Sequence, residues 1–361
     1  MLTFSYKVGE HQYTNKLEAI RENIHTGDPI LLQTPYKDHD FSIEPDESLE
    51  TLIVQHLKSL RDQYKSIRLY YSGGTDSHLL LHYFIKHKVK IDEIVCLKNG
   101  IPGTDHEIEK YAEPMLKKLR QNLRDTKINI KTLTIKDYLD YYSKDIDEQS
   151  IRLGSVGTHT YFRLHWNLDI YGQEPSTDVI NIRGQEKPKI LKHGSDFYSY
   201  HLDLDLETHA NTYQFFSADP NLQAKQCHMY LRSLSKKSGR DAHSDHHTWL
   251  GSIGTPISSW DFPKKVRYPG KGKNFVQWQD KKFYYLNDKD KVAIDWCGKN
   301  HPRLLSLWHE RLQQLKHITK NTWWNYGRPE LNSIGVLSEF RCLTKKQVKT
   351  VENLFPEGFK T

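Results

Sequence analysis

Strand patterns alternate with helical patterns from residue 52 onward, and this alternation restricts the fold more than any other feature of the chain. The strand patterns cover 67–71, 91–97, 128–134 and 178–182. The helical patterns, with apolar residues three and four positions apart, cover 52–60, 77–87, 108–119, 136–142, 158–168 and 221–234. Strands joined by helices of this length run parallel, because the connecting helix returns the chain to the same edge of the sheet. The sequence therefore predicts an α/β fold with a doubly wound, mostly parallel sheet.

The chain has 361 residues, which is more than one ordinary domain requires. We expect a core domain over residues 51–235. A small strand-helix-strand lead-in is expected at 1–50. The region 236–361 is rich in Lys, Trp, Tyr and His and less regular in its patterning, so we interpret it as a C-terminal appendage.

A glycine- and hydroxyl-rich segment joins the first strand pattern to the helical pattern after it. It consists of Ser72, Gly73, Gly74, Thr75, Asp76 and Ser77. Two glycines allow the backbone to bend tightly and approach an anion, and the following helix directs unpaired N–H groups toward it. The three hydroxyls add donors, whereas the carboxylate of Asp76 repels phosphate unless it holds Mg²⁺ between them. The segment predicts a phosphate-binding loop, with an ordinary strand-to-helix turn as the alternative.

The segment Ser72–Ser77 resembles the SGGxDS signature of the PP-loop ATP pyrophosphatases. That family includes asparagine synthetase, GMP synthetase, NAD synthetase, argininosuccinate synthetase and tRNA thiolation and lysidine enzymes. The resemblance covers about residues 50–235 and implies an adenine nucleotide alpha hydrolase-like fold. It also implies that the loop binds the β- and γ-phosphates of ATP, which leave as pyrophosphate, while a substrate oxygen attacks the α-phosphate.

The resemblance implies further site residues at the ends of two other strands. Cys96, Leu97 and Lys98 would lie beside adenine and contact it mainly through backbone groups. In the loop after 178–182, Gly184 would complete the nucleotide site and Glu186 would be a metal ligand. Arg183 or Lys187 would be the cation for the leaving pyrophosphate. This loop departs from the Gly-x-x-x-Asp-Glu form of the family, so a solvated turn is the alternative.

Carboxylates at the start of the predicted helix after Gly103 have two interpretations. By resemblance to asparagine synthetases, Asp105 or Glu107 would face the acceptor substrate. Acidic residues are also favoured in any first helical turn by the helix dipole, and we prefer this second interpretation.

Two other clusters are attractive as sites but have simpler explanations. The segment His243–His247 lacks the ligand spacing of a dedicated metal site, which favours a surface loop. The basic and aromatic segment 260–282 would suit single-stranded nucleic acid. A hairpin with a solvated basic face is the preferred interpretation there. His165 and His228 are expected to be hydrogen-bonded histidines rather than bases.

Charge and composition add weaker limits. The formal charge of +7 suits any phosphate-rich ligand. The four cysteines are far apart, which predicts reduced thiols, and no run approaches the length of a membrane helix. We therefore expect a cytosolic protein that does not enter the membrane.

The sequence as a whole favours an ATP-dependent adenylating enzyme that uses ATP and Mg²⁺. The leading hypothesis is an asparagine-synthetase-like ligase that joins a nitrogen nucleophile to an activated carboxylate of a small molecule. Because residue 2 is Leu2 and only 71 residues precede the loop, we expect no glutaminase module. The alternatives are modification of a nucleobase in tRNA or DNA, and a nucleotide-binding module without catalysis.

Overall fold

The computed structural model describes residues 4–36, 38–148, 176–184, 189–193, 195–201, 212–235, 255–257, 286–318 and 338–354. The predicted helix 158–168, the segments 243–247 and 260–282, and the residues Glu186, Lys187 and His165 lie outside this set. In chain order the elements are β1 (Ser5–Val8), β2 (His11–Tyr13), α1 (Lys16–Thr26), β3 (Ile30–Gln33), α2 (Leu49–Gln63), β4 (Ser66–Tyr70), α3 (Thr75–Lys86), β5 (Glu93–Lys98), η1 (Ile108–Ala112), α4 (Glu113–Lys118), η2 (Arg120–Leu123), β6 (Lys127–Thr132), α5 (Ile135–Tyr142), β7 (Val179–Arg183), β8 (Lys189–His193), β9 (Asp196–Tyr200), β10 (Thr212–Gln214), α8 (Phe215–Ala218), α9 (Pro220–Ser235), β11 (Thr255–Ile257), α12 (Leu286–Asn300), α13 (Pro302–Ile318), β12 (Phe340–Cys342), β13 (Val348–Lys349) and α14 (Val351–Leu354).

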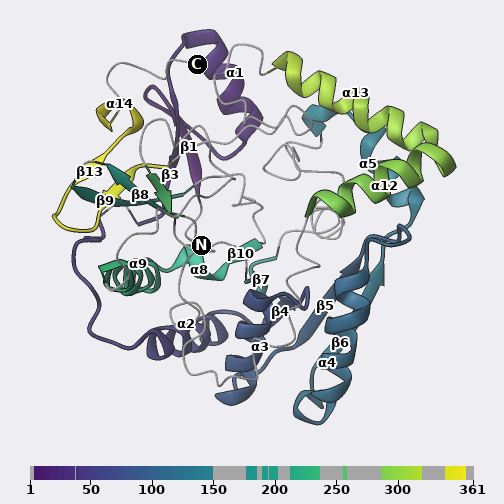
Figure 1. Cartoon of the computed structure of the whole chain (residues 1–361), viewed down its shortest axis with the longest axis horizontal. Coiled ribbons are helices and arrows are strands. Elements are labelled where there is room, and N and C mark those ends of the chain that lie inside the picture. The colour runs from purple at the N-terminus through teal and green to yellow at the C-terminus, as the bar shows by residue number, and fades with distance from the viewer. Residues whose placement is uncertain are drawn as a thin grey trace.

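The described strands form three sheets (Figure 1). The central sheet has five strands in the order β10-β7-β4-β5-β6, and every neighbouring pair is parallel. A small antiparallel sheet, β2-β1-β3, is formed by the N-terminal segment, and an antiparallel sheet, β11-β8-β9-β12-β13, lies at one side of the molecule. The predicted α/β class with a parallel sheet is confirmed.

The order in which successive strands are added to the central sheet reverses beside β4. From β4 the chain moves outward through β5 to β6, whereas β7 and β10 are added on the other side of β4. In open α/β sheets ligands bind beyond the carboxyl ends of the strands at such a reversal, because the connections there diverge. The segment Ser72–Ser77 follows β4 directly and therefore begins at this position.

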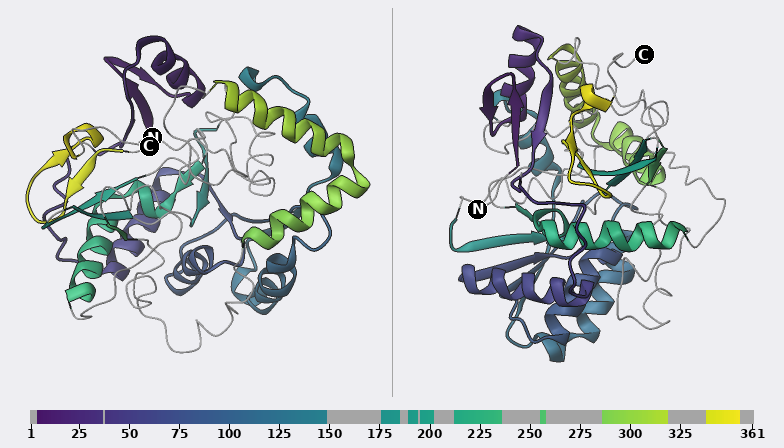
Figure 2. Two further views of the ribbon diagram at one scale, coloured as in Figure 1. Left: turned by 45° about the horizontal axis from the view of Figure 1, so that its top comes forward. Right: turned by 90° about the vertical axis from the view of Figure 1, so that its left-hand side faces the viewer.

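One face of the central sheet is apolar and packs against helices. Ile67 and Leu69 of β4 and Ile94 and Cys96 of β5 are fully buried there against α3, together with Leu79, Leu80, Tyr83 and Phe84. Buried residues of α2 join the same cluster, and α9 lies alongside α2 (Figure 2). The apolar positions of strands and helices that the sequence patterns selected thus meet in one core.

The opposite face of the sheet, which we call the polar face, carries the alternate residues of the same strands. Arg68 of β4 is paired in register with Glu93 of β5 and with Asn181 of β7. Its Nε lies 2.7 Å from Glu93 Oε2, and its Nη1 donates to Asn181 Oδ1 at 3.2 Å. Asn129 of β6 donates to Glu93 Oε1 at 2.9 Å. Parallel sheets are usually apolar on both faces, so this row of polar groups is a departure from the ordinary pattern.

Helical backbone runs without a break over 106–118, as predicted for 108–119, but its type changes along the way. The π-helical turn η1 leads directly into α4, and the 3₁₀ turn η2 follows after residue 119. Pro114 lies in the first turn of α4 and has no N–H to donate to the residue four positions earlier. The change of helical type lies at this proline, which the apolar spacing alone does not reveal.

The C-terminal helices pack against the far end of the central domain (Figure 1). Ala293 and Cys297 of α12 and Leu304 and Trp308 of α13 form a buried cluster with Tyr138 of α5. The described part of the region 236–361 therefore has extensive contacts with 51–235. The domain boundary at residue 236 stays a prediction.

The N-terminal, central and C-terminal segments meet at a buried polar network around Tyr36. The Tyr36 hydroxyl lies 2.6 Å from His201 Nε2 and accepts from Gln223 Nε2 at 2.8 Å. Burial raises the pKa of Tyr36, so the phenol stays protonated. Farther along the chain, Arg341 of β12 donates to Thr34 at 2.9 Å, and its guanidinium lies over the ring of Tyr36.

In the part of the chain that the structure describes, no helix is long and apolar enough to cross a membrane. The cellular compartment stays a prediction.

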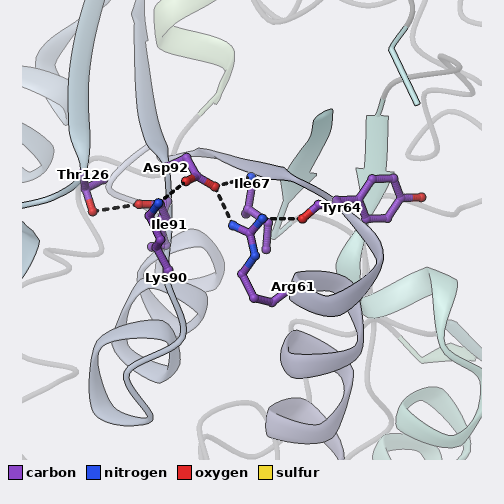
Figure 3. A network of polar contacts seen from close by, with 7 residues as sticks. All are labelled: Arg61, Tyr64, Ile67, Lys90, Ile91, Asp92 and Thr126. Atoms are coloured by element: carbon purple, nitrogen blue, oxygen red, sulfur yellow. Dashed lines mark hydrogen bonds and ion pairs between the residues drawn. The ribbon is translucent and has the colours of Figure 1, made fainter. Parts of the chain in front are cut away.

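Asp92 holds together the amino-terminal ends of the central strands (Figure 3). Its Oδ2 accepts from the backbone N–H of Ile67 at 2.8 Å and from Arg61 at 2.5 Å, and its Oδ1 lies 3.0 Å from Lys90 Nζ. Thr126 donates to the carbonyl of Ile91 at 2.9 Å and joins the next strand to the group. Burial by itself would raise the pKa of Asp92, but the Ile67 N–H and Arg61 hold this pKa below its ordinary value.

Replacing Asp92 by Asn should lower the free energy of unfolding by about 1.5–3 kcal/mol, the usual worth of hydrogen bonds to a charged group. A carboxylate with a lowered pKa in the folded state stabilises the protein above its unfolded pKa of about 3.9 and loses this effect as pH falls through the folded pKa. The difference between wild type and Asp92→Asn should therefore be full at pH 7 and disappear in acid.

Urea unfolding at several pH values measures this difference. Asp178→Asn is the control, because its ion pair with Lys65 is exposed and contributes little. A pH-independent difference would contradict the assignment of the effect to the Asp92 charge.

Candidate functional site

The loop after β4 has a backbone conformation that requires glycine. Gly73 has φ +75°, in the left-handed region. Gly74 is the N-cap of α3 and has no side chain to accept the first amides of the helix. In α1 and α2 the N-caps Asn15 and Ser48 accept such amides. The first turn of α3 therefore lacks the N-cap side-chain acceptor that those helices have, which suits an anionic ligand.

The two serines of the loop stabilise its shape. Ser77 donates its hydroxyl to the Gly74 carbonyl at 3.1 Å and accepts from the Ser72 N–H at 3.3 Å. Ser72 Oγ accepts from the Gly74 N–H at 3.1 Å and lies 3.2 Å from Ser77 Oγ. These hydroxyls, which were expected to donate to phosphate, hydrogen-bond within the loop. Asp76 lies in the first turn of α3 and is partly exposed.

The end of β7 contacts the first turn of α3 at Gly184. A Cβ added to Gly184 would lie 2.8 Å from both the carbonyl carbon of Asp76 and the nitrogen of Ser77. A residue with a side chain does not fit at this backbone separation. The predicted residue Gly184 thus lies beside the predicted loop, although the two are more than 100 positions apart in the chain.

Arg183, the residue before Gly184, is buried on the polar face of the sheet. Its side chain is 2% exposed, and the guanidinium carbon lies 5.8 Å from the centroid of the Tyr70 ring. This distance is that of a cation–π contact. The structure therefore places the predicted cation next to the end of β4, packed on an aromatic ring.

On its other side the loop contacts the π-helical turn η1. A Cβ on Gly73 would lie 3.0 Å from Ala112 Cβ and 3.1 Å from Ala112 N. π-helical turns recur at functional sites because they displace backbone groups from regular positions. The π-helical turn η1 ends at Ala112, the residue that faces Gly73.

The predicted adenine-side residues lie at the carboxyl end of β5. Leu97 is buried with Tyr70 and Val95 on the polar face. Lys98 is ion-paired with Glu113 at 2.6 Å and with Glu109 at 3.5 Å, and the hydrogen bond that Lys98 donates to Glu113 raises the pKa of Lys98. The Lys98 carbonyl accepts from the Leu133 N–H at 2.9 Å. One backbone group expected to contact adenine is therefore already hydrogen-bonded.

Asp105 bridges the loop that follows β5. Its carboxylate accepts from the backbone N–H groups of Asn99 at 2.6 Å and Gly100 at 3.0 Å. Burial raises the pKa of Asp105 despite these bonds. The side chain holds the loop in shape, and this contact is neither of the roles considered from the sequence.

A hydrogen bond between Tyr71 and His78 was not predicted from the sequence. The Tyr71 hydroxyl lies 2.9 Å from His78 Nδ1, and both residues are buried. Burial raises the pKa of Tyr71. Because the two residues flank Ser72–Ser77, the bond joins the end of β4 to the first turn of α3. The spacing of seven residues across a loop gives no periodic signal that would have revealed it.

The structure thus brings together Ser72–Ser77, Arg183 and Gly184, and it places Leu97 and Lys98 on the neighbouring strand. Glu186 and Lys187 are outside the described residues, so their roles stay predictions. His228 lies 2.9 Å from the Phe41 carbonyl through Nε2, as expected for a hydrogen-bonded histidine. Among the described residues no group of three or more His, Cys, Asp or Glu side chains is arranged to hold a metal ion.

No family model matches the chain, and a search of curated proteins finds no match either.

Gly184→Ala should displace the first turn of α3, because the new methyl group would overlap backbone atoms that cannot rotate away. Overpacking of this kind costs about 1–3 kcal/mol. We expect a lower urea midpoint and weaker binding of a non-hydrolysable ATP analogue by calorimetry.

The matched control is Gly298→Ala in α12, where the added Cβ meets nothing closer than Leu305 Cδ2 at 3.5 Å. That variant should be at least as stable as wild type, since alanine favours helices. Wild-type nucleotide affinity in Gly184→Ala would show that the β7 contact does not shape the loop.

Proposed function

We propose that the chain is an ATP-dependent adenylating enzyme that cleaves Mg-ATP to AMP and pyrophosphate at the loop Ser72–Ser77. The observation that carries this proposal is the contact of Gly184 with the first turn of α3 at the reversal of strand order. That contact sets a glycine loop and a helix N-terminus with a glycine N-cap at the position where α/β sheets bind phosphates. It also fits a doubly wound arrangement of the whole domain.

Magnesium fits the residues at this position. Mg²⁺ in nucleotide sites takes one or two carboxylates and otherwise phosphate oxygens and water. Asp76 in the first turn of α3 would supply one carboxylate, and Glu186 after β7 is proposed as the second. When bound, the ion neutralises the charge of the leaving pyrophosphate. A cluster of three protein ligands is not needed for this role.

The remaining residues have roles that follow from charge. The amides of the α3 first turn bind the β- and γ-phosphates, and Arg183 or Lys187 stabilises the negative charge that develops on pyrophosphate. A carboxylate or carbonyl oxygen of the substrate attacks the α-phosphate, and a nitrogen nucleophile then displaces AMP. In the leading form of this proposal the substrate is a small molecule, as in asparagine synthetases.

A second form, modification of a nucleobase, is favoured by the polar face of the sheet. Arg68, Asn181 and Arg183 line this face where a purely structural sheet would be apolar. A carbonyl oxygen of a base would then be the group that ATP activates. The two forms share the same ATP chemistry and differ in the acceptor.

Chromatography of the nucleotide products tests the chemistry. AMP and pyrophosphate are the expected products, and ADP as the main product would exclude the proposal.

Asp76→Asn should lower turnover by about 10²–10³-fold, as do other losses of charge stabilisation in a transition state. The urea midpoint should stay near that of wild type, because asparagine has a similar size and also suits a first helical turn. Ser77→Ala is the comparison: it removes loop hydrogen bonds without removing charge, so it should lower turnover less and stability more. Near-wild-type turnover in folded Asp76→Asn would rule out a metal-binding role for this residue.

A further inference from the structure

A row of side chains crosses the polar face just below the carboxyl edge of the central sheet. Gln214 is the last residue of β10 and is paired in register with Arg183 of β7. Residues paired directly in a parallel sheet project from the same face. Gln214 therefore lies beside Arg183, which packs on Tyr70, and the residue that follows β7 is the Gly184 that contacts α3.

The Gln214 carboxamide is buried without a hydrogen-bond partner. The residue is 4% exposed, and within the described structure neither Oε1 nor Nε2 has a partner. Thr212, two residues earlier on the same face of β10, likewise has an unpartnered hydroxyl. Buried amides are nearly always hydrogen-bonded, because an unpaired amide loses its hydration without compensation. If residue 214 served only to pack the interior, a leucine would destabilise the fold less than this unpaired amide does.

We propose that Gln214 binds the nucleobase edge of the acceptor substrate. A carboxamide presents one donor beside one acceptor, and its complement is a planar group with the reverse arrangement, as on the edge of a base. The positive charge of Arg183 next to it favours a base whose acceptor is an oxygen. The inferred ligand class is thus a heterocycle with a carbonyl next to a ring N–H, as in uracil or guanine.

This inference rests on the second form of the proposed function, modification of a nucleobase, and it puts the base beside the nucleotide loop. From Gln214 the row continues through Arg183 to Gly184 and so reaches the first turn of α3. A carbonyl oxygen bound in this row would be near the phosphates that the loop is proposed to hold. The proposal concerns recognition only and adds no chemical step.

The first experiment separates a binding role from a structural one. Gln214→Leu removes an unpaired amide, so its urea midpoint should equal or exceed that of wild type. Gln226→Leu in α9 is the matched control, because Gln226 is also fully buried with both amide atoms unpartnered. It should likewise keep or gain stability. A clear loss of stability or of folding in Gln214→Leu, but not in Gln226→Leu, would make Gln214 structural and overturn the proposal.

The second experiment measures calorimetric binding of uridine and guanosine, with a non-hydrolysable ATP analogue present. The probes lacking the ring N–H are 3-methyluridine and 1-methylguanosine. Wild type and Gln226→Leu should bind at least one parent nucleoside and bind its methylated form about tenfold or more weakly. Gln214→Leu should lose the preference. Gln214→Glu, which keeps the acceptor but loses the donor, should also bind the parent about tenfold more weakly.

Absence of nucleoside binding to wild type would overturn the inference, as would equal binding of parent and methylated nucleosides. A separate titration with the ATP analogue distinguishes failure of the acceptor assignment from failure of the proposed function. If the analogue binds and AMP is formed but nucleosides do not bind, the acceptor assignment fails alone. If nucleosides bind through Gln214 but ATP is neither bound nor cleaved, the proposed function fails and the base site stands.

Discussion

The contact between two backbones, the end of β7 and the first turn of α3, is the constraint on which the candidate site depends. It exists because Gly184 has no side chain and because β7 pairs directly with β4. A substituent at this position would push the helix away from the strand and would change the direction of its first amides. The pairing of β7 with β4 sets the position of the loop, and the hydrogen bonds of the loop serines and of Tyr71 with His78 stabilise it there. The backbone contact therefore determines the geometry of the site, and side-chain hydrogen bonds stabilise that geometry.

The polar face shows how this sheet balances stability against function. The Arg68, Glu93, Asn181 and Asn129 side chains satisfy one another across four strands, so this part of the face carries little unpaired polarity. On β10 the pairing stops, and Thr212 and Gln214 have polar atoms without described partners. Networks that are fully satisfied add rigidity, whereas unsatisfied ones cost stability. The change from one to the other occurs between β7 and β10, the last described strand on that side of the sheet.

Sequence patterns predicted the parallel sheet and the position of the loop well, because both depend on local signals. Apolar alternation in 67–71 and 91–97 and the glycines of Ser72–Ser77 are readable within a few residues. Contacts between distant segments were not readable, such as the contact of Gly184 with the first turn of α3. The hydrogen bonds that Asp105 accepts from the backbone of Asn99 and Gly100 were not predicted either. The helix predicted over Ile108–Leu119 is present, but apolar spacing did not reveal its π-helical turn before Pro114. No sequence pattern singled out Gln214, because its position beside Arg183 follows from the pairing of β10 with β7 and not from its neighbours in the chain.

The antiparallel sheet has a consequence for how the chain is made. Its strands come from residues 189–200, 255–257 and 340–349, and β12 lies between β9 and β13. During synthesis from the N-terminus, β9 leaves the ribosome with one edge unpaired until β12 follows about 140 residues later. An open strand edge pairs readily with other chains. Between these two points of synthesis the edge of β9 is open to other chains, and the pairing of β12 with β9 closes it.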